Sequence, residues 1–315
     1  MKSGICGTDI SIVKGHLPTP LPIVPGHEFS GIVYGLGDKV DKDLFFKRVT
    51  CEINTNICGI CYFCENGIPT NCIQRQALGI DVDGAFVQYI VVDDYLIHEI
   101  PDSLSFEHAA LLEPLAAAVN TYELMPFTPS DNIVVIYGAG KMGQLIAQVT
   151  KQYSSLFKHK VGDPPMVVVV SRTDEKLAIA KKNGADLIIN SKKEDPVAKI
   201  MEITNNIGAD IVVECTGNPK IMDQVVKSTR TRGKIALKST HGLPTPINIT
   251  DIVVREIALY GTRCGPFEKA KLFLASDLIN LDDLITKRVG LSNINQGLED
   301  AEDSTNIKVI IDNQK

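Results

Sequence analysis

The chain lacks the features that would place it in a membrane, in a secretory pathway or on a nucleic acid. Its 315 residues contain no apolar run of about 18 residues, the length that a membrane-spanning helix needs. The first ten residues, MKSGICGTDI, do not show a basic segment followed by an apolar one, so no secretory signal is expected. A net charge of −6 offers no broad basic surface for nucleic acid or anionic lipid. We therefore expect a cytoplasmic protein that binds neither membranes nor nucleic acids.

Four of the eight cysteines lie close together, and they point to a metal site. Disulfides in a secreted protein would be one use of eight cysteines, but clustering within fifteen residues favours metal ligation in a reducing compartment. Thiolates two residues apart on a tight turn can fill adjacent corners of a zinc tetrahedron, and four thiolates leave no open position. The sequence thus predicts a structural zinc in a lobe at about residues 51–75. Its ligands would be Cys58, Cys61, Cys64 and Cys72.

Three other interpretations of these cysteines remain possible. Four unrelated buried cysteines would be the plainest, although the spacing disfavours it. An iron–sulfur cluster also uses a CxxCxxC run, but here no Cys-Pro follows the run. A zinc ribbon that binds nucleic acid is disfavoured by the acidic balance and by the few Lys and Arg residues around the lobe.

The texture of the sequence changes along the chain, which indicates two domains. The first part is rich in Gly, Pro and Cys and has short β-like runs at 31–36 and 85–92, as in a mostly β module. From Asp131 onward, short apolar runs alternate with helical stretches, which is typical of a parallel sheet covered on both faces. A segment at 158–165 is expected to be an exposed loop. We expect an α/β fold with a mostly β domain at 1–118, a doubly wound domain at 119–262 and a return to the first domain at 263–315.

Two short motifs near the N-terminus offer ligands for a second metal. GICGTD (4–9) contains Cys6, and PGHE (25–28) contains His27 and Glu28. Each motif is weak alone, because a single Cys or His is more often a packed core residue. Together they supply a thiolate, an imidazole and a carboxylate, the mixed set of a catalytic zinc that keeps one position for water or substrate.

The order of the motifs along the chain resembles that of a known protein family. GICGTD, GHE, the cysteine lobe, Glu113-Pro114-Leu115 and a glycine fingerprint follow one another as in the zinc-containing medium-chain dehydrogenases, over essentially the whole chain. The resemblance implies a Rossmann coenzyme domain, a GroES-like catalytic domain and a homodimer or homotetramer. It also implies that Cys6 and His27 bind the catalytic zinc.

The same resemblance assigns expected roles to the neighbouring polar residues. Glu28 and Glu113 match two carboxylate positions of the family. One carboxylate is a further zinc ligand and the other is a partner of the bound water, and the assignment of the two roles stays open. Glu113 stands where simple alcohol dehydrogenases have a cysteine, as in the polyol, sugar and threonine branches. Asp9 matches a carboxylate that orients the histidine, with helix capping as the alternative. Thr8 matches the hydroxyl that passes the substrate proton outward, while Ser11 stands where a relay histidine is frequent.

In this family the first of these motifs normally lies behind several strands. Here the GICGTD motif begins at residue 4. We therefore expect the GroES-like domain to lack its first strands, about thirty residues, and to expose a sheet edge.

A glycine fingerprint predicts the dinucleotide site. It follows an apolar strand and opens a helix, so the backbone can approach a pyrophosphate at the helix N-terminus. The predicted contacts are Gly138, Gly140, Lys141, Met142 and Gly143, with Thr216 on the loop that lies along the nicotinamide. Cys215 beside it is expected to be a packing residue.

The end of the next strand predicts the choice of coenzyme. Ser171 and Arg172 stand where an NAD enzyme has an acidic residue, and a small hydroxyl with a guanidinium suits the 2′-phosphate of NADP. The alternative is that Arg172 lies on the surface while Asp174 binds the ribose.

These expectations combine into one function. The sequence predicts a zinc-dependent oxidoreductase that transfers a hydride between an alcohol, polyol or sugar and NADP(H), with one catalytic and one structural zinc. The alternative is a truncated, non-catalytic protein that binds zinc and nucleotide. Retention of the full candidate set argues against that alternative: Cys6, Thr8, His27, Glu28 and Glu113.

Overall fold

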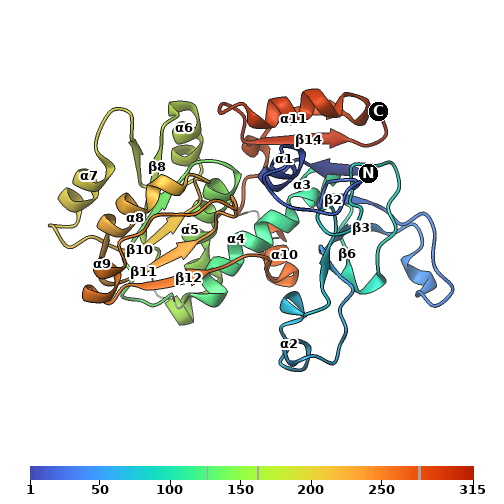
Figure 1. Ribbon diagram of the computed structural model, residues 1–315, viewed down its shortest axis with the longest axis horizontal. Coiled ribbons are helices and arrows are strands. Elements are labelled where there is room, and N and C mark those ends of the chain that lie inside the picture. Colours follow the sequence, from blue (N-terminus) through green and yellow to red (C-terminus); the bar gives the residue numbers. More distant parts are fainter. Residues whose placement is uncertain (126, 162, 276–277) are drawn as a thin grey trace. The chain divides into compact units, whose positions relative to one another are not determined.

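The computed structural model describes residues 1–125, 127–161, 163–275 and 278–315, and the chain divides into two compact units (Figure 1). The first unit contains Met1–Glu113 and Ile285–Lys315, and the second contains Pro114–Leu284. None of the described helices is long and apolar enough to cross a membrane.

The limits of the second unit differ from those expected at residues 118 and 262. Residues up to Leu284 belong to this unit because the last segment is tied to its helices. The ring of Phe273 lies 6.4 Å from that of Tyr153, and the backbone N–H of Asn280 donates to Gln148 Oε1 at 2.6 Å.

The first unit is built on a six-stranded sheet in the order β13-β14-β1-β2-β3-β6. All neighbouring strands pair antiparallel except β13 and β14. The strands are β1 (Lys2–Gly4), β2 (Glu28–Ile32), β3 (Arg48–Cys51), β6 (Ile97–Glu99), β13 (Ile285–Gly290) and β14 (Lys308–Asp312), and β4 (Asn54–Thr55) pairs with β5 (Gln76–Ala77). The helices are α1 (Gly7–Val13), α2 (Tyr62–Glu65), α3 (Phe106–Ala110) and α11 (Ile294–Glu302).

Of the two β-like runs in the first unit, one forms a shorter strand than expected and the other forms no strand among the described elements. The first is a strand only up to Ile32, the end of β2, and residues 85–92 form no strand among the described elements. The apolar alternation of the second run still has a packing role, since Ile90 and Val92 contact the buried cluster while Val91 is 96% exposed. The backbone N–H groups of Ala85 and Phe86 donate to the carbonyls of Gly26 and Pro25 at 2.8 and 3.0 Å, which is too short a pairing to form a strand.

The second unit is a doubly wound parallel sheet, which confirms the predicted fold class. Its strand order is β12-β11-β10-β7-β8-β9, and every pair is parallel. The strands are β7 (Ile133–Tyr137), β8 (Met166–Ser171), β9 (Leu187–Asn190), β10 (Ala209–Glu214), β11 (Thr229–Leu237) and β12 (Ala258–Gly261). The helices are α4 (Leu112–Leu124), which begins in the first unit, α5 (Lys141–Val161), α6 (Asp174–Lys182), α7 (Pro196–Ile203), α8 (Met222–Ser228), α9 (Ile249–Val254) and α10 (Phe267–Ala275).

Helices cover both faces of this sheet, as its sequence predicts. Helices α7 and α8 pack together on one face, and α5 and α6 lie together on the other (Figure 1). The middle strands are therefore buried on both sides, and Val134, Val168 and Val212 have no exposed surface. The loop expected at 158–165 is helical as far as Val161, while residue 162 lies outside the described residues.

The strand order fixes where a ligand can bind. Strand β7 has β8 on one side and β10 on the other. The chain therefore runs from β7 through β8 to β9 toward one edge of the sheet, and from β10 through β11 to β12 toward the other edge. Sheets of this type bind ligands in the crevice at the carboxyl ends of such strands.

Candidate functional site

The four lobe cysteines converge on one point. Their sulfur atoms all lie within 4.8 Å of one another. The separations are 3.5 Å for Cys58–Cys72 and for Cys61–Cys64, and 4.0 Å for Cys58–Cys64. Zn–S bonds of about 2.3 Å in a tetrahedron imply sulfur atoms about 3.8 Å apart, whereas a disulfide bond is only about 2.05 Å long. The lobe therefore has the dimensions of a four-thiolate zinc site.

The backbone of the lobe favours thiolates. Backbone N–H groups of Cys64 and Ile73 lower the pKa of Cys61 to about 6. The backbone N–H of Cys58 lies 3.4 Å from the sulfur of Cys72 and lowers the pKa of Cys72. Desolvation and the neighbouring Cys61 sulfur instead raise the pKa of Cys64 to about 12. Four sulfur atoms this close cannot all ionise without a cation between them, which is what a bound zinc would supply.

The second candidate cluster brings together three residues from the starts of two elements, α1 and β2. Cys6 is the N-cap of α1, His27 precedes β2, and Glu28 begins β2. Their ligand atoms lie within 4.8 Å of one another. His27 is 4% exposed and Glu28 is fully buried. The pairing of β1 with β2 creates this arrangement, because Gly4 lies opposite Glu28 in the register and Cys6 follows two residues later.

Asp9 has both of the roles considered for it. Its Oδ2 accepts from the backbone N–H of Cys6 at 2.7 Å, which caps α1. Its Oδ1 accepts from the N–H of Gly26 at 3.1 Å and lies 3.3 Å from His27 Nδ1. One buried carboxylate thus holds both ligand-bearing segments in place.

The cluster favours positive charge. Burial alone would lower the pKa of His27, but the charges of Asp9 and Cys6 outweigh it and raise this pKa well above its usual value. A site whose field attracts a proton onto a buried imidazole also attracts a metal cation, and its donor set fits zinc.

Lys308 is a site residue that the sequence motifs did not reveal. It lies on β14, and its ammonium forms an ion pair with Glu28, with both side chains completely buried. The same ammonium donates to the backbone carbonyl of Ile5 at 2.8 Å. No local pattern could indicate this contact, since β14 reaches the cluster only through its pairing with β1.

The other predicted catalytic residues lie near the cluster to different degrees. Thr8 Oγ1 is 3.8 Å from the sulfur of Cys6. Glu113, in the first turn of α4, is 9% exposed and stands outside the set of ligand atoms within 4.8 Å found among the described residues. The hydroxyl of Ser11 donates to the carbonyl of Gly7 at 3.0 Å, so it is engaged within its own helix.

The glycine fingerprint of the second unit follows the carboxyl end of β7 and leads into α5. Gly138 has φ +112°, and a Cβ there would lie 2.8 Å from the carbonyl oxygen of Cys215. A Cβ at Gly143 would lie 1.8 Å from the carbonyl oxygen of Gly138. Both positions need glycine for the tight turn that starts α5. Lys141 and Met142 are half-buried in the first turn of this helix, beside Gly140.

The loop after β10 lies against the fingerprint turn. Thr216 is exposed, and its hydroxyl donates to Glu214 Oε1 at 2.7 Å and accepts from the N–H of Asn218 at 3.0 Å. Burial raises the pKa of the Cys215 thiol, which contacts the carbonyl of Tyr137 at 3.2 Å. This cysteine packs against the fingerprint turn and remains a neutral thiol.

The end of β8 distinguishes the two candidates for the coenzyme ribose. Asp174 is held by Asn190 Nδ2 at 2.7 Å and by Lys193 Nζ at 2.8 Å, and these bonds lower its pKa. Arg172 is exposed, and its guanidinium has no ion-pair partner among the residues that the structure describes. The acid is thus already paired, whereas the cation is available.

A doubly wound fold with a glycine fingerprint, a thiolate–imidazole–carboxylate cluster and a four-cysteine lobe defines a zinc-type dehydrogenase. Family comparisons agree. Residues 1–102 match the alcohol dehydrogenase GroES-like domain, and residues 160–280 match the zinc-binding dehydrogenase family.

Individual proteins resemble the chain over nearly its whole length. D-arabitol-phosphate dehydrogenase of Enterococcus avium is 31% identical over 98% of this chain and 87% of its own length. Sorbitol dehydrogenase of Halalkalibacterium halodurans is 30% identical over 98% of this chain and 89% of its own length. Among solved structures, the alcohol dehydrogenase RspB of Escherichia coli CFT073, complexed with NADH, superposes with a TM-score of 0.87 at 28% identity, covering 98% of this chain and 89% of that one. A zinc-binding dehydrogenase of Sinorhizobium meliloti 1021, bound to NADP, superposes with a TM-score of 0.84 at 26% identity and covers the same shares of the two chains.

The chain therefore belongs to the zinc-containing medium-chain dehydrogenase family and is an oxidoreductase.

Proposed function

We propose that the protein oxidises a secondary hydroxyl of a polyol, sugar or related alcohol, or reduces the corresponding ketone, with NADP(H) as coenzyme. The observation that carries the coenzyme assignment is the edge of β8, where Arg172 is unpaired within the described chain and Asp174 is bound by Asn190 and Lys193. The substrate class rests on Glu113 in place of a cysteine and on relatives named as sorbitol and D-arabitol-phosphate dehydrogenases.

In this proposal Cys6, His27 and Glu28 hold the catalytic zinc, because their ligand atoms are already gathered within 4.8 Å. Glu113 is left for the remaining carboxylate role. Cys58, Cys61, Cys64 and Cys72 hold the structural zinc. That full set of thiolates leaves no position for a substrate.

The chemistry that the catalytic ion supplies when bound is Lewis acidity, which makes a substrate hydroxyl easier to deprotonate. The protein supports it with residues of its own. Asp9 orients His27, Lys308 holds the carboxylate of Glu28, and the hydroxyl of Thr8 passes on the substrate proton. Since Ser11 is bonded to Gly7, the proton leaves through water or the coenzyme ribose rather than through residue 11.

The coenzyme assignment is tested by titrating the purified protein with NADPH and NADH and following coenzyme fluorescence. Charge-assisted hydrogen bonds are worth about 1.5–3 kcal/mol, so we expect NADPH to bind roughly ten- to a hundredfold more tightly. Arg172→Ala should remove most of this preference, and Ser171→Asp should reverse it. Arg232→Ala is a matched control, because Arg232 is an exposed arginine paired with Glu256 at 3.1 Å. Equal affinities, or tighter NADH, would contradict the assignment.

Two further features of the protein are part of the proposal. Strand β12 is an edge of the parallel sheet, and Leu259 on it, with Val253 and Val254 of α9, is exposed by 42%, 67% and 74%. Such an edge favours pairing with a second copy, so we propose a homodimer or homotetramer, which sedimentation velocity would test. The structure describes all eight cysteines and joins none of them in a disulfide, which supports a reducing compartment such as the cytoplasm.

A further inference from the structure

The loop that follows β9 carries an exposed cation, Lys192, at a strand end next to that of Arg172. Ser171 and Asn190 are partners in the parallel register of β8 and β9, so the two strands end at the same level. The backbone N–H of Ser191 donates to the carbonyl of Ser171 at 2.9 Å, which holds the start of the loop against the end of β8. Lys192 is the next residue along the chain.

Lys192 is held in a defined place by its backbone. Its N–H donates to Asn190 Oδ1 at 2.9 Å, while the amide nitrogen of the same Asn190 side chain donates to Asp174 at 2.7 Å. The N–H of Lys193 donates to the carbonyl of Asn190 at 2.9 Å and completes the turn. The ammonium of Lys192 is close enough to Asp174 to act on that carboxyl electrostatically. Asp174 itself is two residues from Arg172.

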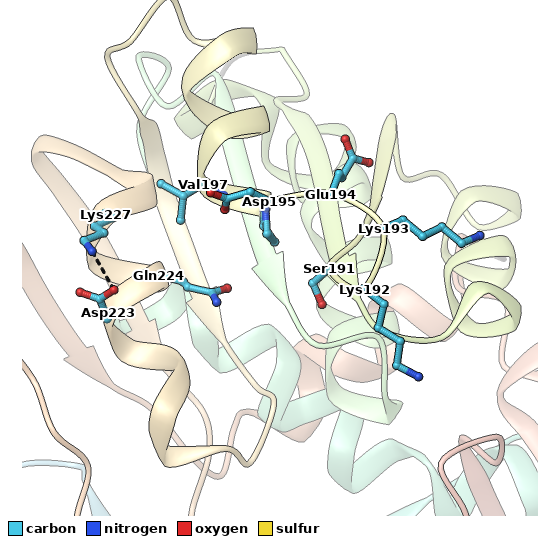
Figure 2. Close-up of a pocket in the computed structure, with 10 residues that line it drawn as sticks. Ser191, Lys192, Lys193, Glu194, Asp195, Val197, Asp223, Gln224 and Lys227 are labelled. Carbon is cyan, nitrogen blue, oxygen red and sulfur yellow. Dashed lines mark hydrogen bonds and ion pairs between the residues drawn. The ribbon is translucent and has the colours of Figure 1, made fainter.

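The neighbouring lysines Lys193 and Lys227 are paired with acids, while the carboxylates of Glu194 and Asp195 line the same groove as Lys192. A groove of about 620 Å³ adjoins the loop (Figure 2), and its lining includes Ser191, Lys192, Asp223, Gln224 and Lys227. Lys227 pairs with Asp223 at 2.9 Å on one wall, and Lys193 pairs with Asp174 at 2.8 Å.

The side chain of Lys192 has no ion-pair partner within the part of the chain that the structure describes. It extends away from the Asp223–Lys227 pair (Figure 2). Two unpaired cations, Arg172 and Lys192, thus stand at the level ends of β8 and β9.

We propose that Lys192 is a specificity-determining residue whose ammonium binds the 2′-phosphate of NADP(H) together with Arg172. The inference rests on the proposed NADP(H) function and extends it to a residue on a different strand end. A 2′-phosphate carries nearly two negative charges, so a single guanidinium leaves it incompletely neutralised. Lys193 has an indirect part, because its bond to Asp174 keeps that acid neutralised beside the phosphate.

The test compares Kd values for NADPH, NADH and 2′,5′-ADP in the wild type and in Lys192→Ala, with the zinc-loaded protein and low salt. We expect Lys192→Ala to weaken NADPH and 2′,5′-ADP by about tenfold, or about 1.4 kcal/mol, and to leave NADH unchanged. Lys192→Arg should restore tight NADPH binding. Lys227→Ala, on the other wall of the groove and already paired, is the matched lysine control and should change none of the three.

Several outcomes would overturn the inference. An unchanged NADPH affinity in Lys192→Ala, while the wild type still prefers NADPH, would refute the role of Lys192 and leave the NADP(H) proposal standing. Equal losses for NADPH and NADH would show that the side chain only supports the loop. A wild type that prefers NADH would refute the proposed coenzyme itself, and the role of Lys192 with it.

Discussion

At the scale of single residues, the catalytic cluster depends on charges that sequence motifs show only in part. Cys6, His27 and Glu28 stand in recognisable motifs, and their chemistry predicts a zinc site. Lys308 stands in an ordinary strand-like run near the C-terminus. Its role comes from burial beside Glu28, 280 residues away along the chain. The sequence could single out candidate metal ligands, which the structure brings together, because ligands need particular residue types at set spacings. A partner brought by sheet pairing leaves no such pattern.

The buried pair leads to a prediction about stability. Replacing one partner of a buried ion pair leaves an uncompensated charge, which costs about 3–5 kcal/mol. We expect Lys308→Met to lower the free energy of unfolding by about that amount in urea titrations of the zinc-free protein, where no metal compensates Glu28. Lys47→Met is the control, since Lys47 pairs with Glu99 at 2.9 Å on the surface, with side chains 45% and 53% exposed. It should leave stability essentially unchanged. Similar stabilities of the two variants would show that the Lys308–Glu28 pair contributes little.

At the scale of elements, strand–turn–helix order was predictable and local strand pairing was not. The run at 132–137 and the fingerprint after it lead directly to β7 and α5, because apolar period and glycine geometry are local properties. The run at 85–92 is also largely apolar, but its backbone pairing, from Ala85 and Phe86 to Gly26 and Pro25, is too short to form a strand. Pairing depends on what lies next to a segment in space, which alternation alone does not contain.

The fingerprint glycines should respond differently to substitution. Gly143→Ala should destabilise the protein and abolish coenzyme binding, because the new Cβ would lie 1.8 Å from the carbonyl oxygen of Gly138. Gly140→Ala meets no atom within 4 Å, so the fold should remain intact. Coenzyme binding should still weaken, since the open space there is where a pyrophosphate approaches. Thermal melting with and without coenzyme separates the two effects, and a stable Gly143→Ala that binds coenzyme would contradict this geometry.

The number of zinc ions bound per chain tests whether the cysteine lobe is a metal site. Cys61→Ser should lower bound zinc from two equivalents per chain to one and should reduce stability, because three thiolates no longer complete the tetrahedron. The catalytic cluster should keep its ion, since it shares no ligand with the lobe. Elemental analysis measures both, with Cys264→Ser as the control that keeps two. A Cys61→Ser protein with two zinc ions and parental stability would mean that the lobe is not a metal site.

At the scale of the whole molecule, the two kinds of ligand belong to different compact units. The two candidate metal clusters lie in Met1–Glu113, and the glycine fingerprint lies in Pro114–Leu284. Both units were expected from the change in texture along the sequence. The end of the second unit was harder to predict, because α10 and the segment after it have no coenzyme motif and are joined to it through Tyr153 and Gln148.

The central claim is that hydride transfer to or from a coenzyme bound in one unit depends on a zinc ion held in the other. Cys6→Ala and His27→Ala test it most directly, with zinc content, NADPH affinity and turnover on a panel of alcohols, polyols and sugars measured on the same samples. Each variant should lose one equivalent of zinc and all detectable turnover, while its NADPH affinity stays within about twofold of the parent, well under the tenfold change that 1.4 kcal/mol represents. Turnover at the parental rate in either variant would contradict the zinc mechanism.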